Sequence, residues 1–230
     1  MWTDVTGDRL WDSGRLLQRV VTDPDSCAAL LPANNQAIPP AEVLELGAGT
    51  GITAIMLATH WPCSRYVATD LPQRVDAIAS RVRDHGLQDS ITAAPLIWGA
   101  NPPLPLITSE SESATSLILL ADLLYWSGSD VLEPDTLEPL AHTLSLALQQ
   151  RPWAIAICTF RERNPEREEY FLQRLCHERY GLAVDAPLEA QRVAELSPGP
   201  EERTDVDALG PLRLWRIQSG SALEKGRVKG

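Results

Sequence analysis

Three glycines at alternate positions, Gly47, Gly49 and Gly51, interrupt an otherwise apolar stretch of the chain. The apolar segment 41–46 precedes them and an apolar helical pattern over 51–60 follows, which predicts a strand, a tight turn and a helix. Glycine permits backbone angles that a side chain would forbid, and it lets the main chain approach a ligand closely. The stretch therefore indicates a turn that binds a ligand.

Two carboxylates accompany this turn. Glu45 lies near the end of the first predicted strand, where an unpaired buried charge would be costly. Asp70 ends the next apolar strand, about twenty residues after the glycines. In a nucleotide-binding βαβ unit, an acid at that place accepts hydrogen bonds from ribose hydroxyls.

The spacing of the glycines decides between nucleotides. A dinucleotide fingerprint, G-x-G-x-x-G, would need its third glycine at Ile52, whereas the chain has it at Gly51, and no G-x-x-x-x-G-K-[ST] phosphate loop is present. Glu-x-Gly-x-Gly-x-Gly followed by Asp70 resembles the S-adenosylmethionine signature of the seven-strand methyltransferases. The alternative is a glycine turn in some other α/β protein.

Charge and length limit the class of protein. The chain has 230 residues, a length that suffices for one domain with a buried core. Its formal net charge is -11. A nucleic-acid partner would require a basic face, so this charge argues against one. The charge suits a cationic substrate, although acidity is also a common route to solubility.

The sequence lacks the patterns of a membrane span, a signal peptide and a metal site. No apolar run approaches the roughly 20 residues of a membrane span, and residues 1–4 carry no signal pattern. The four cysteines lack C-x-x-C spacing, which predicts neither a zinc site nor a disulfide framework. We expect no metal, no membrane partner, and a location in the cytoplasm or also in the nucleus.

Lysine is scarce, because only Lys225 and Lys229 occur and arginine supplies every other fixed cation. Codon bias is one explanation, and avoidance of self-modification by a lysine-modifying enzyme is another. The sequence leaves both open.

Apolar periodicity predicts an N-terminal helix over 8–21 and a loop over 22–40, after which strands and helices alternate. The expected strands are 41–46, 65–69, 91–97, 116–120, 153–159, 190–195 and 212–217; the expected helices are 51–60, 72–85, 131–149 and 165–180. The segment 101–113 is expected to be an exposed connection.

This alternation predicts an α/β fold: a seven-stranded, mostly parallel twisted sheet with helices on both faces and an antiparallel edge hairpin formed by the last two strands. We expect three parts: an N-terminal helix and loop over 1–40 that complete the cofactor site, a methyltransferase domain over 41–218, and a flexible tail over 219–230.

Five predicted strand ends carry unusual residues. The glycine turn, Asp70, Trp98, Asp122 and Arg161 follow the first to fifth strands in turn. Ligands of open α/β sheets bind outside the carboxyl ends of the strands. We therefore expect these residues to share one edge of the sheet.

The chain resembles the seven-strand protein-lysine methyltransferases of methyltransferase family 16, which modify elongation factors, chaperones and similar non-histone proteins. The similarity runs over about 7–217, and the matching segments are Leu10-Trp11-Asp12, 43–51, Thr69-Asp70, Ile97-Trp98-Gly99 and 121–125. Asp-x-x-Tyr after the fourth strand is the more diagnostic motif, because methyltransferases of many kinds share the glycine loop.

The resemblance implies a role for each matching residue. Gly47, Ala48 and Gly49 would contact the methionine part of S-adenosylmethionine, and Asp70 would bind the ribose. The full set implied for the cofactor is Trp11, Glu45, Gly47, Ala48, Gly49, Gly51, Asp70, Leu71, Trp98 and Ala121. Trp98 would lie on the adenine and Trp11 would close the site. Core packing is the alternative for each tryptophan, and the place of Trp98 at a strand end favours the functional role.

Asp122 and Tyr125 are three residues apart, so a turn can place both beside the transferred methyl group. A carboxylate and a phenol there would orient the attacking amine and favour the cationic transition state. Alternatively, Asp122 caps a helix and Tyr125 packs in the core.

The expected function is methyl transfer to a lysine of a non-histone protein, such as a translation elongation factor or a chaperone, by a monomeric enzyme whose partner is that protein substrate. Two other classes stay open. A small-molecule N-methyltransferase would have a closed pocket at Asp122. A cofactor-binding interaction module would lack catalysis.

Overall fold

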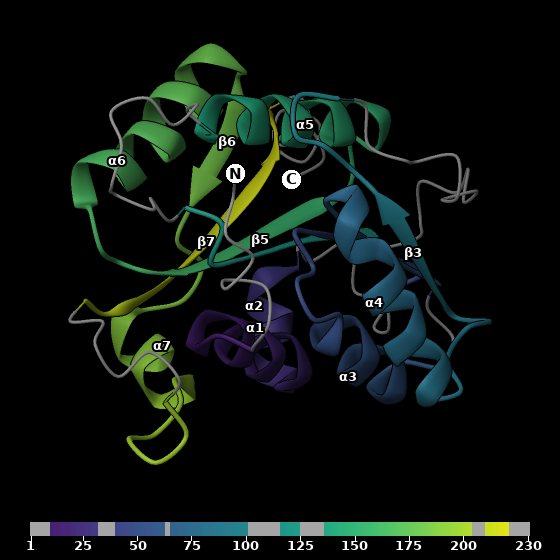
Figure 1. Cartoon of the computed structure of the whole chain (residues 1–230). Helices are drawn as coiled ribbons and strands as arrows, with labels where there is room; N and C mark the ends of the chain where they lie inside the picture. Colours follow the sequence, from purple (N-terminus) through teal and green to yellow (C-terminus); the bar gives the residue numbers. More distant parts are fainter. Residues whose placement is uncertain are drawn as a thin grey trace.

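The computed structural model describes residues 10–31, 40–62, 65–100, 116–124, 136–203 and 210–220, which build a seven-stranded sheet between two helical layers (Figure 1). The strands lie in the order β3-β2-β1-β4-β5-β7-β6. They are β1 (Glu42–Leu46), β2 (Arg65–Asp70), β3 (Ile91–Pro95), β4 (Ser116–Ala121), β5 (Ile155–Arg161), β6 (Leu182–Asp185) and β7 (Leu212–Ser219).

Strands β1 to β5 pair in parallel, and β7 is antiparallel to both β5 and β6. Strand order reverses between β1 and β4, where the chain crosses from one half of the sheet to the other. The predicted α/β fold and its antiparallel edge are therefore confirmed.

Alternate side chains of the central strands enter two apolar clusters, one on each face of the sheet. Leu44 and Ile118 pack with α5 (Leu137–Gln150) and with η2 (Tyr170–Arg179), a π-helical stretch that continues α6 (Pro165–Glu169). Val43 and Leu117 belong to the cluster of the opposite face. Its helices are α1 (Asp12–Thr22), α2 (Pro24–Leu30), α3 (Ile52–His60), α4 (Pro72–Asp84) and α7 (Ala190–Leu196).

The segment expected as a loop over 22–40 contains helix α2, so that prediction is wrong for residues 24–30. The Asp23 carboxylate accepts hydrogen bonds from the N–H of Ser26 at 2.9 Å and from its hydroxyl at 2.6 Å, and Pro24 occupies the first turn. This acid and proline are start signals of a helix as much as of a loop.

The antiparallel edge also differs in detail from the prediction. The segment expected as a strand over 190–195 is helix α7, and the strand lies earlier, at β6. Helix α7 therefore connects β6 to β7, and β7 inserts between β5 and β6. A run of seven helical residues in which Val193 alone is buried has too little periodicity to reveal its type.

Several expected segments fall outside the described residues, among them 101–113, 131–135 and 221–230. The expected boundary after 218 falls at the end of β7, whose last residue is Ser219. Within the described part of the chain, no helix has both the length and the apolar character to cross a membrane.

Candidate active site

The carboxyl ends of β1, β2, β3, β4 and β5 meet along one edge of the sheet. Leu46 pairs with both Thr69 and Leu120, Asp70 pairs with Pro95, and Ala121 pairs with Thr159. The structure thus brings the glycine turn and the residues after the other strands to a single rim, as the predicted topology requires.

The turn after β1 depends on glycine. Gly47, Gly49 and Gly51 all have positive φ, at 63°, 54° and 73°. A Cβ atom on Gly47 would lie 2.6 Å from Leu123 Cδ2 and 3.4 Å from Trp98 Cζ2. A side chain at this position would therefore collide with Leu123, which follows β4, and would touch Trp98, which follows β3.

Asp70 fastens this turn to the end of β2. Its Oδ2 accepts a hydrogen bond from the N–H of Gly49 at 2.6 Å, and its Oδ1 accepts one from the N–H of Leu71 at 2.7 Å. The N–H of Ala48 also donates to the carbonyl of Thr69 at 2.8 Å. Each carboxylate oxygen of Asp70 still has a lone pair for another donor.

Glu45 is a buried carboxyl group beneath the turn, with 3% of its surface exposed. Burial raises its pKa to about 8, hydrogen bonds from the Thr53 side chain and the Ala54 N–H oppose that rise, and the charge of Asp70 adds to it. Glu45 Oε2 is buried without a hydrogen-bond partner among the described residues. A cationic donor at this oxygen would offset the cost of burial.

The remaining predicted cofactor residues lie around the same rim. Trp98 is half-buried and packs against the core between the sheet and α5. Trp11 is half-buried at the N-cap of α1, and Leu71 precedes α4. Ala121 is half-buried at the end of β4 and packs on the opposite cluster.

Asp122 adopts a left-handed backbone conformation, with φ of 59°, and is 6% exposed. No other described non-glycine residue has a positive φ. Its N–H donates to the Thr159 carbonyl at 2.8 Å, which fixes the turn after β4 against β5. Such backbone strain is concentrated at functional sites. Tyr125, its predicted companion, lies outside the described residues.

Arg163 forms a two-pronged ion pair with Asp122. Its Nη1 and Nη2 donate to Asp122 Oδ1 and Oδ2 at 2.7 Å and 2.8 Å, and the Arg161 N–H lies 3.3 Å from Oδ1. Sequence reasoning missed this arginine. The available signal was a pair of arginines two residues apart at a strand end, of which Arg161 alone was taken as a rim residue.

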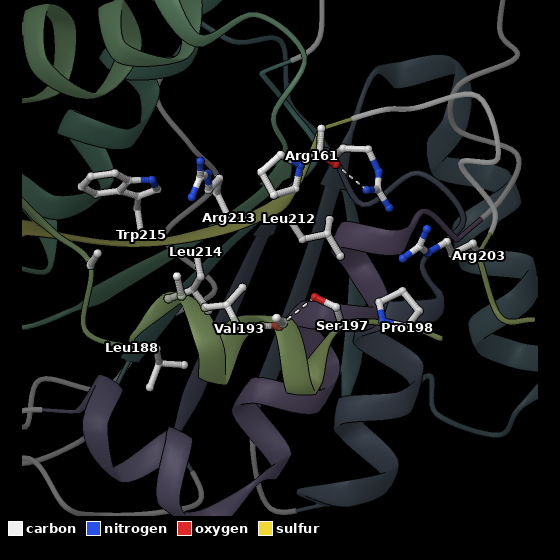
Figure 2. Close-up of a pocket in the computed structure, with 15 residues that line it drawn as sticks. Arg161, Leu188, Val193, Ser197, Pro198, Arg203, Leu212, Arg213, Leu214 and Trp215 are labelled. Atoms are coloured by element: carbon white, nitrogen blue, oxygen red, sulfur yellow. Dashed lines mark hydrogen bonds between the residues drawn. The ribbon is translucent and has the colours of Figure 1, made fainter. Parts of the chain in front are cut away.

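Arg161 forms a second, fully buried ion pair that ties α1 to the end of β5. Its Nη2 lies 2.5 Å from Asp12 Oδ2, with the side chains 6% and 0% exposed. Its Nη1 donates to the Gly210 carbonyl at 2.7 Å (Figure 2). Because Trp11 immediately precedes Asp12, this pair also fixes where that tryptophan enters the rim.

A pocket of about 550 Å³ lies between α7 and β7 (Figure 2). Val193, Leu212 and Leu214 give it an apolar wall, and Arg161 and Arg203 contribute polar groups. It shares Arg161 with the rim but extends along the antiparallel part of the sheet. Sequence reasoning missed it because α7 was expected to be a strand.

The described cysteines are buried thiols. Cys27, Cys158 and Cys176 are buried and free, while Cys63 lies outside the described residues. Burial raises the pKa of Cys27 to about 11 and that of Cys176 to about 12, so these thiols stay protonated. Across the described ranges, no three His, Cys, Asp or Glu side chains are grouped to hold a metal ion.

Residues 1–178 match the sequence model of a family described as lysine methyltransferase. The chain belongs to the lysine methyltransferase family. The predicted family is confirmed, and membership makes S-adenosylmethionine the cofactor, as the glycine spacing and Asp70 indicate.

Two curated relatives are protein-lysine N-methyltransferases. The chain is 30% identical to EFM2 of Saccharomyces cerevisiae over 131 residues, which cover 53% of this chain and 31% of that protein. It is 28% identical to EFM3 of Chaetomium thermophilum over 175 residues, or 73% of this chain and 46% of that protein. The chain thus spans less than half the length of either relative.

Among solved structures, the methyltransferase domain of bacterial CtHen1-CN is similar in fold. The TM-score is 0.51 at 12% identity, and the match covers 86% of this chain and 98% of that domain. This likeness supports the fold assignment alone.

Proposed function

We propose that the protein transfers a methyl group from S-adenosylmethionine to the side-chain amine of a lysine in another protein. The observation that carries the proposal is the strained, buried carboxylate of Asp122 on the same rim as the glycine turn. The family match and the names of the two curated relatives support the same reaction.

The residues around the glycine turn fit the cofactor. The unpartnered oxygen of Glu45 suits the cofactor's ammonium group, and the open backbone at Gly47 and Gly49 suits its methionine part. Asp70 would accept hydrogen bonds from the ribose, and Trp98 would cover the adenine. When bound, S-adenosylmethionine supplies an electrophilic methyl group on a sulfonium centre.

Five further residues would shape the walls of this site: Trp11, Ala48, Gly51, Leu71 and Ala121. Gly51 lets α4 pack closely, because a Cβ there would lie 2.9 Å from Ile78 Cγ2. Ala121 and Ala48 are small, so they leave room at the ends of β4 and β1. Trp11 would cover the cofactor from the N-terminal side.

Asp122 would act on the lysine. The nucleophile must be a neutral amine, and a fixed carboxylate can accept its N–H and align its lone pair with the methyl carbon. We propose Tyr125 as a second hydrogen-bonding group for that amine.

The substrate we propose is a translation elongation factor or a chaperone. The net charge of -11 favours encounter with a lysine-bearing surface, and it opposes nucleic acid as partner. We propose that the enzyme acts as a monomer in the cytoplasm.

The test is to incubate the protein with cofactor tritiated on its methyl group and a panel of purified elongation factors and chaperones, beside a whole-cell extract. Label should appear on a lysine side-chain amine after digestion. Asp122→Asn should abolish the labelling, and Glu178→Gln, in an exposed ion pair with Arg174, serves as the matched control. Label confined to small molecules, or to another side chain, would contradict the proposal.

A further inference from the structure

We propose that Arg163 is a positioning residue that cancels the charge of Asp122, so that the incoming lysine is held as a neutral amine and not as an ammonium ion. The inference rests on the proposed function, because it requires a lysine beside Asp122.

The Asp122–Arg163 pair leaves room for one more donor. Both guanidinium contacts are short, at 2.7 Å and 2.8 Å, and use one lone pair on each carboxylate oxygen. The Arg161 N–H, at 3.3 Å, takes a third position. A carboxylate has about four acceptor positions, so the donors of the described residues leave one for an amine N–H.

The loop that carries Arg163 is itself anchored. Oε1 of Glu168 accepts hydrogen bonds from the N–H of Arg163 at 2.7 Å and of Asn164 at 3.1 Å, and Glu168 is 4% exposed. Asn164 in turn caps α6 by accepting from the Arg167 N–H at 3.2 Å. Arg163 therefore reaches Asp122 from a fixed backbone, and its own side chain is 32% exposed.

Cancelling this charge serves the reaction. A lone buried carboxylate would bind the ammonium form and raise the pKa of a lysine that already titrates near 10 in water, leaving little nucleophile at neutral pH. A two-pronged arginine–carboxylate pair is neutral as a whole and keeps the geometry of the carboxylate. Such a pair still accepts an N–H, yet it gives an ammonium little advantage over an amine.

Two other charged groups of the described residues lie near Asp122. Arg161 of β5 is paired with Asp12 of α1. Oε1 of Glu168 in α6 accepts hydrogen bonds from two backbone N–H groups, and its Oε2 is buried without a hydrogen-bond partner among the described residues. The thiol of Cys158 in β5 faces the same region, and burial raises its pKa, so it stays neutral. Arg163 is the arginine whose guanidinium group contacts the Asp122 carboxylate directly, so its replacement changes the charge of that pair.

The test uses two adenosine analogues, in which a nitrogen replaces the cofactor's sulfur and carries either an aminopropyl arm or a propyl arm. Calorimetry from pH 6 to 9 gives the affinity ratio of the two analogues, and this ratio cancels titrations that are common to both.

In the unaltered protein the aminopropyl analogue should bind more tightly than the propyl analogue, and this advantage should grow as pH rises. In Arg163→Gln its advantage at pH 7 should increase on the order of tenfold, the equivalent of one pKa unit, and should shrink as pH rises. Arg163→Lys keeps the positive charge but not the two-pronged contact, so the aminopropyl advantage should still grow as pH rises.

The outcomes separate this inference from the proposed function. If the amino group adds no affinity in the unaltered protein, no amine site lies there and the proposed function fails. If it adds affinity, yet Arg163→Gln binds the aminopropyl analogue no tighter, Arg163 is merely structural and the inference is overturned. Should Arg163→Gln not fold, the unaltered protein still decides, because an advantage that falls with rising pH means the ammonium is bound.

Discussion

Asp70 holds two backbone N–H groups on the rim, one from the glycine turn and one from its own turn. Its replacement therefore removes both a proposed ribose contact and the fastening of the turn. We expect Asp70→Ala to weaken S-adenosylmethionine binding by about 1.5–3 kcal/mol, the value of a hydrogen bond to a charged group. Calorimetry measures this, with the exposed Asp84→Ala as control. An affinity equal to that of the control would remove Asp70 from the site.

Glu45 links stability and cofactor binding to pH. Its pKa is about 8 in the folded protein, against 4.5 for the ordinary group, so the folded state holds an extra proton between these values. Glu45 makes its full contribution to the free energy of unfolding below about pH 4.5, and this contribution is lost as the pH rises through about 8. A bound ammonium group would favour the charged carboxylate and expel that proton.

We therefore predict that cofactor binding at pH 7 releases up to about one proton, visible as a buffer-dependent heat in calorimetry. Glu45→Gln should release none, and without cofactor it should unfold at a higher temperature than the parent at pH 9. Equal buffer dependence in both proteins would show that the cofactor does not contact Glu45.

Some residues of the rim could be predicted from a short sequence motif, and others depend on contacts between distant parts of the sequence. Gly47 and Asp70 could be predicted because each belongs to a short motif whose spacing reflects the turn itself. The role of Arg163 could not, since its partner Asp122 lies 41 residues away in sequence and their meeting depends on the pairing of β4 with β5.

At the scale of elements, α1 is joined to β5 by the buried pair of Asp12 and Arg161. Removing one member of a buried pair leaves an uncompensated charge, so Asp12→Ala should lower the free energy of unfolding by about 3–5 kcal/mol. Asp185→Ala is the matched control, because Asp185 pairs with Arg216 between β6 and β7 but is 52% exposed. It should cost about 1 kcal/mol or less. Urea unfolding would contradict the account if both variants lost the same stability.

Elements with a strong apolar pattern could be predicted from the sequence. Elements whose form depends on tertiary contacts could not. Strands β1, β2, β4 and β5 are apolar runs that are mostly buried on both faces, so their place follows from the sequence alone. Helices α2 and α7 have seven residues each and few buried side chains, and tertiary contacts decide their form. An ion pair from Arg192 of α7 to Asp23, the N-cap of α2, is one such contact, at 2.7 Å.

At the scale of the whole molecule, we predict that methyl transfer needs no metal ion. No Asp or Asn pair follows Asp122 at a spacing that would complete an octahedral set of oxygen ligands. Methyl transfer should therefore persist in a chelator, as followed by tritium incorporation. A loss on chelation that magnesium restores would instead favour an oxygen-methylating enzyme.

The most direct test of the central claim, that Asp122 acts on the lysine and not on the cofactor, is a single-turnover rate for Asp122→Asn at saturating cofactor, with its calorimetric cofactor affinity measured beside it. The account predicts a rate lower by at least about 100-fold and a dissociation constant within about twofold of the parent, because the lost contact forms mainly in the transition state. A variant that transfers methyl at the parent rate, or that no longer binds cofactor, would contradict it.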